Sequence, residues 1–398
     1  MRMDNSIKKI AIMTGGGDAP GLNAVVRAAA LTAIKKYGLE VVGIKNGYRG
    51  LFLGESQMVP LTEENVAGII GKGGTVLYNS NKDNLFKYPK RNKDGFVRDE
   101  NGNIIYENLS NVAVENLKKA GIDALVIVGG DGTLTSGRDY SRMGVKVIGV
   151  PKTIDNDLNS TDVTFGFDTA VCRSTEAIEC LRTTGEAHHR IMVLEVMGRS
   201  AGHLALHSGI AGAADVILIP EIPYDINIVA KKVKEALKSD RQYAIVVVSE
   251  GVNGPDGKAL GTATDLSPDG FKFKGVGDSV ATALQNIINS DRDDNGYAIS
   301  ETLMDVEARA VALSHISRGG SPSAGDRVLC TRYGSYAIDA LLNGKNKHMV
   351  SLRNGELTTV ELEEVIPSND MNSNFRPVEV DGELVNLART IGISFGDK

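Results

Sequence analysis

The sequence predicts an α/β protein of two stacked three-layer α/β/α domains with mostly parallel sheets. Three observations predict it: short apolar runs that end in glycine or proline turns, amphipathic stretches between those runs, and 45 glycines against 11 prolines in 398 residues. Apolar runs without polar alternation are typical of strands buried on both faces, and strands that alternate with helices are typical of parallel sheets.

The elements follow in order along the chain. The predicted strands are β-branched apolar runs before a turn; they cover residues 8–14, 39–44, 123–130, 145–151, 190–198, 214–220 and 243–250. The predicted helices have apolar residues at helical spacing; they cover residues 23–36, 112–120, 171–183 and 228–238. Stretches 90–108 and 253–275 contain the turn sequences DENGN and SPDG and are predicted surface insertions.

Composition excludes several classes of function. A net charge of −6 and the absence of Trp argue against a nucleic-acid or anionic-membrane partner, so an anionic ligand must be held by local cations. The three cysteines lack metal-ligand spacing and are predicted to be reduced core thiols. No apolar run matches a signal peptide or the roughly 20 residues of a membrane span. We therefore expect a cytoplasmic protein.

Two glycine turns follow predicted strands. The first, residues 14–21, reads TGGGDAPG, and Gly16 there would let backbone N–H groups approach a phosphate. Alone, such a turn is as compatible with an ordinary strand-to-helix connection as with a phosphate-binding site. The second, residues 129–133, reads GGDGT. Asp131 could hold Mg²⁺ and Gly132 leaves room for polyphosphate, although an Asp that only caps the next helix is the alternative.

A third strand end carries the residues 151–157, which read PKTIDND. It places one cation, one hydroxyl and two carboxylates at the carboxyl edge of the sheet, where open α/β folds bind ligands. A kinase needs a carboxylate near the acceptor hydroxyl and a metal-held phosphate close by. The three turns together therefore predict phosphoryl transfer.

Six segments occur in the order typical of one family: GGGDAPGLN, GGDGT, PKTIDND, HHRIMVLEVMGRSAGH, VVSEG and HISRGGSPSAGDR. On these segments the chain resembles the phosphofructokinase family, from about Ile7 to Leu342. GGDGT alone would also suit NAD kinases or lipid kinases, whereas six ordered segments are specific. The resemblance implies a Mg²⁺-dependent enzyme of glycolysis that phosphorylates the 1-hydroxyl of fructose 6-phosphate.

Roles carried over by matching positions complete the expected site. Asp155 would be the general base, with Thr153 and Lys152 beside the transferred group, and Arg199 would stabilise its developing charge. The nucleotide would be bound by Gly16, Gly130, Asp131, Gly132 and Thr133, and Asp131 would hold the metal. The sugar phosphate would be bound by Thr153, Ile154, Asp155, Arg190, Met197, Gly198, Arg199, Glu250, Arg309, His315, Ile316, Ser317 and Arg318.

The resemblance also implies how the chain is divided and assembled. The donor-binding domain would comprise residues 1–166 plus about 317–367, and the fructose 6-phosphate-binding domain residues 167–316 plus about 368–398. In the family, Arg190 and Arg309 reach in from a neighbouring subunit. The resemblance therefore implies a homo-oligomer, a tetramer or a dimer, with shared sites.

Two positions disagree about the phosphoryl donor. Gly132 is the ATP-type residue, because an Asp there would repel the α-phosphate of a nucleotide, whereas Lys152 is typical of pyrophosphate-dependent relatives. An extra lysine excludes nothing, so ATP is predicted and pyrophosphate stays the alternative. The family's usual nucleotide-phosphate arginine is replaced by Asn81, with Lys82 as a potential substitute.

The effector site of bacterial relatives looks incomplete. Arg27, Arg182 and Asp215 match positions in it, but Leu31 stands where a second helix arginine is expected. The sequence therefore predicts weak or altered control by nucleotides and phosphoenolpyruvate.

Two further functions stay open. A catalytically silent regulatory subunit would bind sugar phosphate as a sensor, but it should have lost Asp155, Asp131 or Arg199, and all three are present. A dinucleotide-binding oxidoreductase is disfavoured because GGGDAPG lacks G-x-G-x-x-G spacing.

Overall fold

The computed structural model describes residues 4–80, 83–93, 95–254, 266–267, 270–271, 275–290, 305–368 and 374–398. The chain divides into two compact units. Unit 1 comprises Met1–Thr153, Leu158–Gly166 and Gly319–Asn374, and unit 2 comprises Ile154–Asp157, Phe167–Arg318 and Phe375–Lys398. The sequence-based division kept Ile154–Asp157 with the donor-binding part, whereas the structure groups these residues with unit 2.

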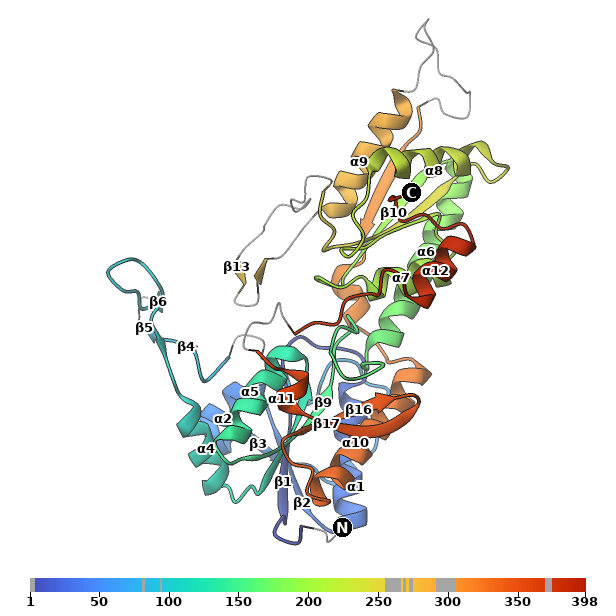
Figure 1. The fold of residues 1–398 in the computed structure, drawn as a ribbon. Coiled ribbons are helices and arrows are strands. Elements are labelled where there is room, and N and C mark those ends of the chain that lie inside the picture. The colour runs from blue at the N-terminus through green and yellow to red at the C-terminus, as the bar shows by residue number, and fades with distance from the viewer. Residues whose placement is uncertain are drawn as a thin grey trace, which may run out of the picture. The chain divides into compact units, whose positions relative to one another are not determined.

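Unit 1 is built on a seven-stranded sheet (Figure 1). The strand order is β17 (Glu356–Glu361), β16 (His348–Arg353), β9 (Lys146–Pro151), β8 (Ala124–Gly129), β1 (Lys9–Thr14), β2 (Glu40–Ile44) and β3 (Met58–Pro60). The five inner strands are parallel, and the two edge strands β3 and β17 run antiparallel to their neighbours. The carboxyl ends of β1, β8 and β9 therefore lie side by side.

Helices cover both faces of this sheet because successive strand residues point to opposite sides. Ile10 and Ile12 of β1 join a core with α1 (Leu22–Tyr37) and α10 (Ala324–Leu342). Ala11 and Met13 join a second core on the other face. The helices of that core are α2 (Gly47–Leu53), α4 (Ser110–Lys119), α5 (Asp131–Arg142) and α11 (Leu362–Val365), while α3 (Glu63–Val66) packs on α1 and η1 (Gly54–Gln57) follows α2.

Unit 2 repeats the three-layer plan around a smaller, parallel sheet. Its strand order is β11 (Val216–Leu218), β12 (Ala244–Ser249), β10 (Ile191–Val196) and β15 (Ala308–Ala312). One face packs on α8 (Ile226–Lys238) and α9 (Val276–Asn289). On the other face, Met192 approaches Gly185 of α6 (Phe167–His188) and Ile217 approaches Gly209 of α7 (His203–Ala211). The helix α12 (Glu383–Thr390) also belongs to this unit.

The predicted fold class is confirmed, and each predicted strand and helix coincides with an observed one. Stretch 90–108 carries the short strands β5 (Arg91–Asn92) and β6 (Gly95–Phe96), with β4 (Tyr88–Pro89) paired to β7 (Tyr106–Glu107). The carboxylate of Asp99 accepts from the backbone of Asn101 and Asn103 and closes the predicted DENGN turn. In 253–275, β13 (Leu266–Ser267) pairs with β14 (Gly270–Phe271), while 255–265, 268–269 and 272–274 lie outside the described residues.

The prediction for the cysteines is partly wrong. Cys330 is buried in the core of unit 1, but Cys172 and Cys180 are exposed on α6. Helical spacing around 171–183 correctly indicated a helix, but it did not reveal which face that helix buries. Among the described residues, no helix has the length and apolar character needed to cross a membrane.

Candidate active site

Three adjacent strand ends of unit 1 form one edge that is joined by backbone hydrogen bonds. The N–H of Gly15, after β1, donates to the carbonyl of Val128 in β8 at 3.0 Å. The N–H of Lys152, after β9, donates to the carbonyl of Gly129 at 3.0 Å. The first glycine turn, the GGDGT turn and the start of PKTIDND therefore meet at the carboxyl edge of the sheet, as predicted.

A glycine cradle lies at this edge, formed by Gly16, Thr133 and Lys152. A Cβ atom added to Gly16 would lie 3.4 Å from Thr133 Oγ1 and 3.5 Å from Lys152 Nζ. Gly16 also has φ +75°, a left-handed conformation that favours glycine. Lys152 is only 4% exposed, so its ammonium is held beside the turn. The left-handed backbone of Gly16, a hydroxyl and a buried cation therefore lie together at the start of α5, a combination that suits an anionic ligand.

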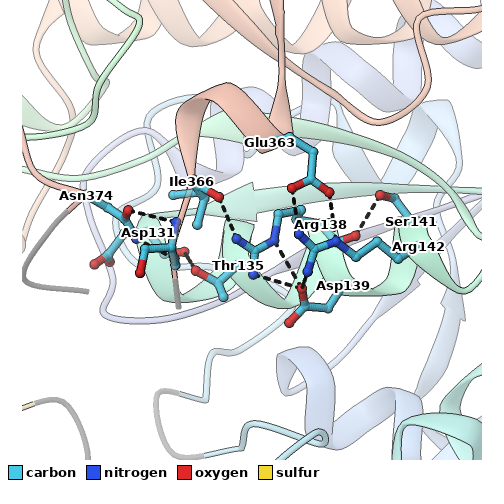
Figure 2. A network of polar contacts seen from close by, with 10 residues as sticks. Asp131, Thr135, Arg138, Asp139, Ser141, Arg142, Glu363, Ile366 and Asn374 are labelled. Atoms are coloured by element: carbon cyan, nitrogen blue, oxygen red, sulfur yellow. Dashed lines mark hydrogen bonds and ion pairs between the residues drawn. The ribbon is translucent and has the colours of Figure 1, made fainter. Parts of the chain in front are cut away.

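Helix α5 begins at this cradle and is fixed at its other end by an arginine network (Figure 2). Arg138 is almost fully buried, and it donates to the carbonyl of Ile366 at 2.5 Å and pairs with Asp139 at 2.9 Å. Arg142 pairs with Glu363 at 2.6 Å. These contacts tie α5 to α11 and the loop after it, and so they fix the helix N-terminus where Asp131 lies.

Asp131 suits the predicted metal role. It is the first residue of α5, directly after the N-cap residue Gly130, and the Thr135 hydroxyl donates to its backbone carbonyl at 2.8 Å. Among the described residues no group of three or more potential metal-binding side chains occurs. Mg²⁺ in phosphoryl-transfer sites is commonly bound by only one or two carboxylates plus substrate phosphates, so a single Asp fits the group.

Unit 2 carries Asp155, and an arginine that sequence reasoning missed holds its loop. Asp155 and Asn156 are 3% and 5% exposed. The backbone N–H of Arg376 donates to the carbonyl of Asp157 at 2.6 Å, and Arg376 Nη2 donates to the carbonyl of Asn156 at 2.9 Å. Arg376 lies outside the six family-like segments, so no motif indicated it.

Asp155 lies close enough to Glu250 for their charges to interact. Burial raises the pKa of Glu250 to about 7, and the negative charge of Asp155 adds to this rise. Glu250 Oε1 accepts from the backbone N–H of Arg199 at 3.2 Å. The charge of Arg318 acts in the opposite direction on the same carboxyl. Four predicted residues, Asp155, Arg199, Glu250 and Arg318, therefore belong to one cluster of unit 2.

Two glycines explain how the turn with Arg199 packs so tightly. Gly198 has φ +148°, and a Cβ there would lie 2.5 Å from the carbonyl of Ala201. A Cβ on Gly251 would lie 1.7 Å from the carbonyl of Arg199. The segments MGRSAG and SEG are therefore in close backbone contact, which aligns Arg199 with Glu250.

Arg190 and Arg309 form a second cluster around Glu307. Arg190 lies 2.7 Å and Arg309 3.2 Å from its carboxylate oxygens. The pairing of β10 with β15 places Met192 opposite Arg309, and Arg190 directly precedes β10. The Arg309 side chain is 60% exposed. Of the neighbouring residues His315, Ile316 and Ser317, which lie in η3 (Ser314–Arg318), Ser317 is buried and Ile316 is strongly exposed.

The residues at the expected effector positions have internal partners. Asp215 accepts from Arg241 at 2.7 Å and from the backbone N–H of Ile245 at 2.9 Å. Arg182 donates to the hydroxyl of Tyr243 at 3.1 Å. In unit 1, Arg27 donates to the carbonyl of Ala67 at 3.2 Å, and Leu31 packs on the core around α1. Asn81 and Lys82 lie outside the described residues.

Comparison with known proteins gives one family. The profile of the family described as Phosphofructokinase matches residues 9–341. The chain is 51% identical over 396 residues to "ATP-dependent 6-phosphofructokinase 2" of Clostridium perfringens, with 99% of this chain and all of that protein covered. It is 38% identical to "ATP-dependent 6-phosphofructokinase 1" of a Synechocystis species, with 98% of this chain and 99% of that protein covered.

Solved structures agree at the level of the fold. Phosphofructokinase from Saccharomyces cerevisiae matches with a TM-score of 0.72 and 28% identity over 90% of this chain. This chain spans only 45% of the yeast chain. A pyrophosphate-dependent phosphofructokinase from Marinobacter aquaeolei matches with a TM-score of 0.69 over 98% of this chain and 88% of that chain, but at 20% identity it supports the fold alone.

Proposed function

Because the chain belongs to the phosphofructokinase family, we propose that it is an ATP-dependent 6-phosphofructokinase that phosphorylates the 1-hydroxyl of fructose 6-phosphate. The observation that carries the proposal is full-length similarity combined with retained chemistry. Asp155 and Arg199 both lie near Glu250 in unit 2, and unit 1 has a glycine cradle beside a buried lysine. Turnover of the purified chain with ATP and fructose 6-phosphate tests it.

In the proposed reaction Asp155 accepts the proton of the sugar 1-hydroxyl as that oxygen attacks the terminal phosphorus of ATP, whose bond to the bridging oxygen breaks so that ADP leaves. Negative charge grows on the transferred phosphoryl oxygens. Arg199, with its planar guanidinium, and the ammonium of Lys152 stabilise that charge, while Thr153 donates a hydrogen bond to the group. The backbone of Gly16 and of Gly130 to Thr133 binds the phosphates of the donor.

Asp131 is the residue that would hold Mg²⁺. When bound, the ion neutralises phosphate charge and polarises the bond to the leaving group. Asp131 lies in the first turn of α5, and the arginine network further along the helix anchors it to α11 and the loop after it.

ATP is the donor that the similarity favours, because the relatives at 51% and 38% identity are named ATP-dependent. Gly132 agrees with this assignment. Lys152 beside Gly16 could bind the charge of either donor. Initial rates with ATP and with pyrophosphate at fixed fructose 6-phosphate decide the question; efficient turnover with pyrophosphate and little with ATP would contradict the proposal.

The sugar phosphate is proposed to bind to residues of two subunits. Within one chain, Asp155 belongs to the cluster around Glu250, whereas Arg190 and Arg309 pair with Glu307. The family resemblance assigns these two arginines to the site of a neighbouring subunit, in a homotetramer or a homodimer, and the 60% exposure of the Arg309 side chain is compatible with this role. Mixing the inactive variants D155S and R309A tests this, since shared sites restore part of the activity on subunit exchange and independent sites restore none.

Weak regulation is also proposed. Asp215 and Arg182 are engaged by Arg241, Ile245 and Tyr243, which would compete with an effector for the same groups. Strong sigmoidal control on titration with ADP and phosphoenolpyruvate would contradict this. A silent sugar-phosphate sensor would instead bind fructose 6-phosphate tightly without turnover, and an oxidoreductase would bind NAD. The expected location is the cytoplasm.

A further inference from the structure

Arg376 makes two hydrogen bonds to the short loop that carries Asp155. Its backbone N–H reaches the carbonyl of Asp157 at 2.6 Å, and its guanidinium Nη2 reaches the carbonyl of Asn156 at 2.9 Å. Asp155 and Asn156 are both buried. One arginine, more than 200 residues further along the chain, thus binds both of the carbonyls that follow the proposed base.

The loop has a conformation that needs such support. Asn156 has φ +53°, in the left-handed region that a non-glycine residue seldom adopts, and such residues persist when their surroundings over-determine them. A hydrogen bond from a charged guanidinium is stronger than one between neutral groups. The bond from Arg376 to the Asn156 carbonyl therefore stabilises the turn that immediately follows Asp155.

Arg376 is itself anchored within unit 2. The ring Nε2 of His203, at the start of α7, donates to the carbonyl of Arg376 at 3.0 Å. Burial, followed by the nearby positive charge of Arg376, lowers the pKa of His203 to about 4, so the ring is neutral at pH 7. Glu221 Oε1 accepts from the backbone N–H groups of Gly202 and Val378, at 2.9 and 2.8 Å. The backbone from Arg376 to Val378 is therefore anchored to the start of α7 and to Glu221.

We propose that Arg376 is a positioning residue that orients the carboxylate of Asp155 toward the acceptor hydroxyl. The proposal rests on the proposed function, in which Asp155 is the base. It assigns Arg376 no contact with substrate, so removal should affect turnover and not binding. Misplacing a reacting group by about 1 Å can cost on the order of 10²-fold in rate.

The experiment compares R376A with R376K and with the matched control R389A. Arg389 lies in the same segment and pairs with Asp397 at 2.7 Å, away from the loop. We expect R376A to lower kcat about 10- to 100-fold, with KM for both substrates within about twofold. The kcat of R376K should lie between those of the wild type and R376A, and R389A should keep kcat within about twofold of the wild type. Adding guanidinium to R376A should restore part of kcat.

A double-mutant comparison shows whether Arg376 acts through Asp155. In the D155S background, R376A should have little further effect, because the group it positions is gone. The proposal is overturned if R376A keeps more than half of kcat, if KM for fructose 6-phosphate rises as much as kcat falls, or if the two substitutions are additive. If R376A does not fold by circular dichroism, R376K and R376Q are measured against the same criteria. Absent turnover by the wild-type chain would instead reject the proposed function.

Discussion

The two units prepare their functional groups by different means. Unit 1 uses backbone: three parallel strands end together, and Gly16 lies beside the buried Lys152. Unit 2 uses side chains: Glu250 accepts from the turn of Arg199, and Arg376 holds the loop of Asp155. The difference matters because the backbone turns of unit 1 are formed by short runs of consecutive residues. The side-chain contacts of unit 2 join residues far apart in the chain.

The comparison also separates binding from chemistry. Fixed backbone donors recognise phosphate whatever the protonation state of nearby groups. A cluster of buried carboxylates is sensitive to pH and to the placement of single side chains. Changes in unit 1 should therefore act mainly on the donor, and changes in unit 2 on turnover and on the sugar.

The largest effect is expected for D155S. Removing a general base costs roughly 10²- to 10⁴-fold, so kcat should fall by that factor while fructose 6-phosphate affinity changes little. Steady-state rates and equilibrium binding of the sugar phosphate measure the two quantities. The control D225S alters an exposed carboxylate of the same unit that caps α8, and it should leave kcat unchanged. Near-normal turnover by D155S would remove Asp155 from the mechanism.

The next effect is expected for G132D in unit 1. A second carboxylate beside Asp131 would repel the phosphates of the donor by several kcal/mol at 4 Å for an effective dielectric of about 20. We expect kcat/KM for ATP to fall about 100-fold, with sugar-phosphate affinity unchanged. G68D is the control, because Gly68 is exposed in the same unit and a Cβ there meets nothing within 4 Å. A loss of sugar-phosphate binding in G132D would contradict the expectation that changes in unit 1 act mainly on the donor.

A pH effect of about 10- to 100-fold in total is expected from Glu250, because hydrogen bonds to a charged group contribute about 1.5–3 kcal/mol. Its pKa is raised to about 7, so the protonated form predominates below that pH and cannot accept hydrogen bonds from sugar hydroxyls as a carboxylate does. Fructose 6-phosphate affinity should rise with pH until about 7 and then level off. In E250Q the rise in affinity that is due to Glu250 should be absent, whereas any pH dependence that is due to the phosphate group of the sugar should remain.

Glu250 also affects folding stability with a defined sign. Its folded-state pKa lies above the ordinary 4.5, so the fold binds the proton more tightly than the unfolded chain does. The free energy of unfolding should therefore decrease as pH rises from about 4.5 to about 7. Denaturant unfolding of the wild type and E250Q across this pH range measures this free energy. If it depended on pH in the same way in both proteins, the raised pKa of Glu250 would be contradicted.

The smallest effect is expected for E307Q. Without the carboxylate, Arg190 and Arg309 lose their common partner and repel one another. Exposed ion pairs contribute about 0.2–1 kcal/mol, so KM for fructose 6-phosphate should rise about two- to fivefold with kcat unchanged. E364Q, which removes the exposed pair of Glu364 with Arg353 in unit 1, is the control and should leave KM as it is.

The sequence predicted the donor side more fully than the acid–base side. Strand ends and glycine turns are local patterns, so the meeting of residues 15–16, 129–133 and 151–153 could be expected from a parallel sheet alone. The roles of Asp155 and Arg199 came from the family resemblance. Arg376 and Glu307 had no local signal, because their partners are set by tertiary packing. The exposure of Cys172 and Cys180 was missed for the same reason, since periodicity gives a helix and not its neighbours.

The division of the chain into alternating segments has a consequence for synthesis. Ile154–Asp157 leave the ribosome roughly 220 residues before Arg376, a delay of about 10 to 45 s at typical elongation rates. During that interval the left-handed turn at Asn156 lacks the guanidinium that stabilises it. The loop of the proposed base would therefore reach its final geometry only after the C-terminal segment of the chain has been made.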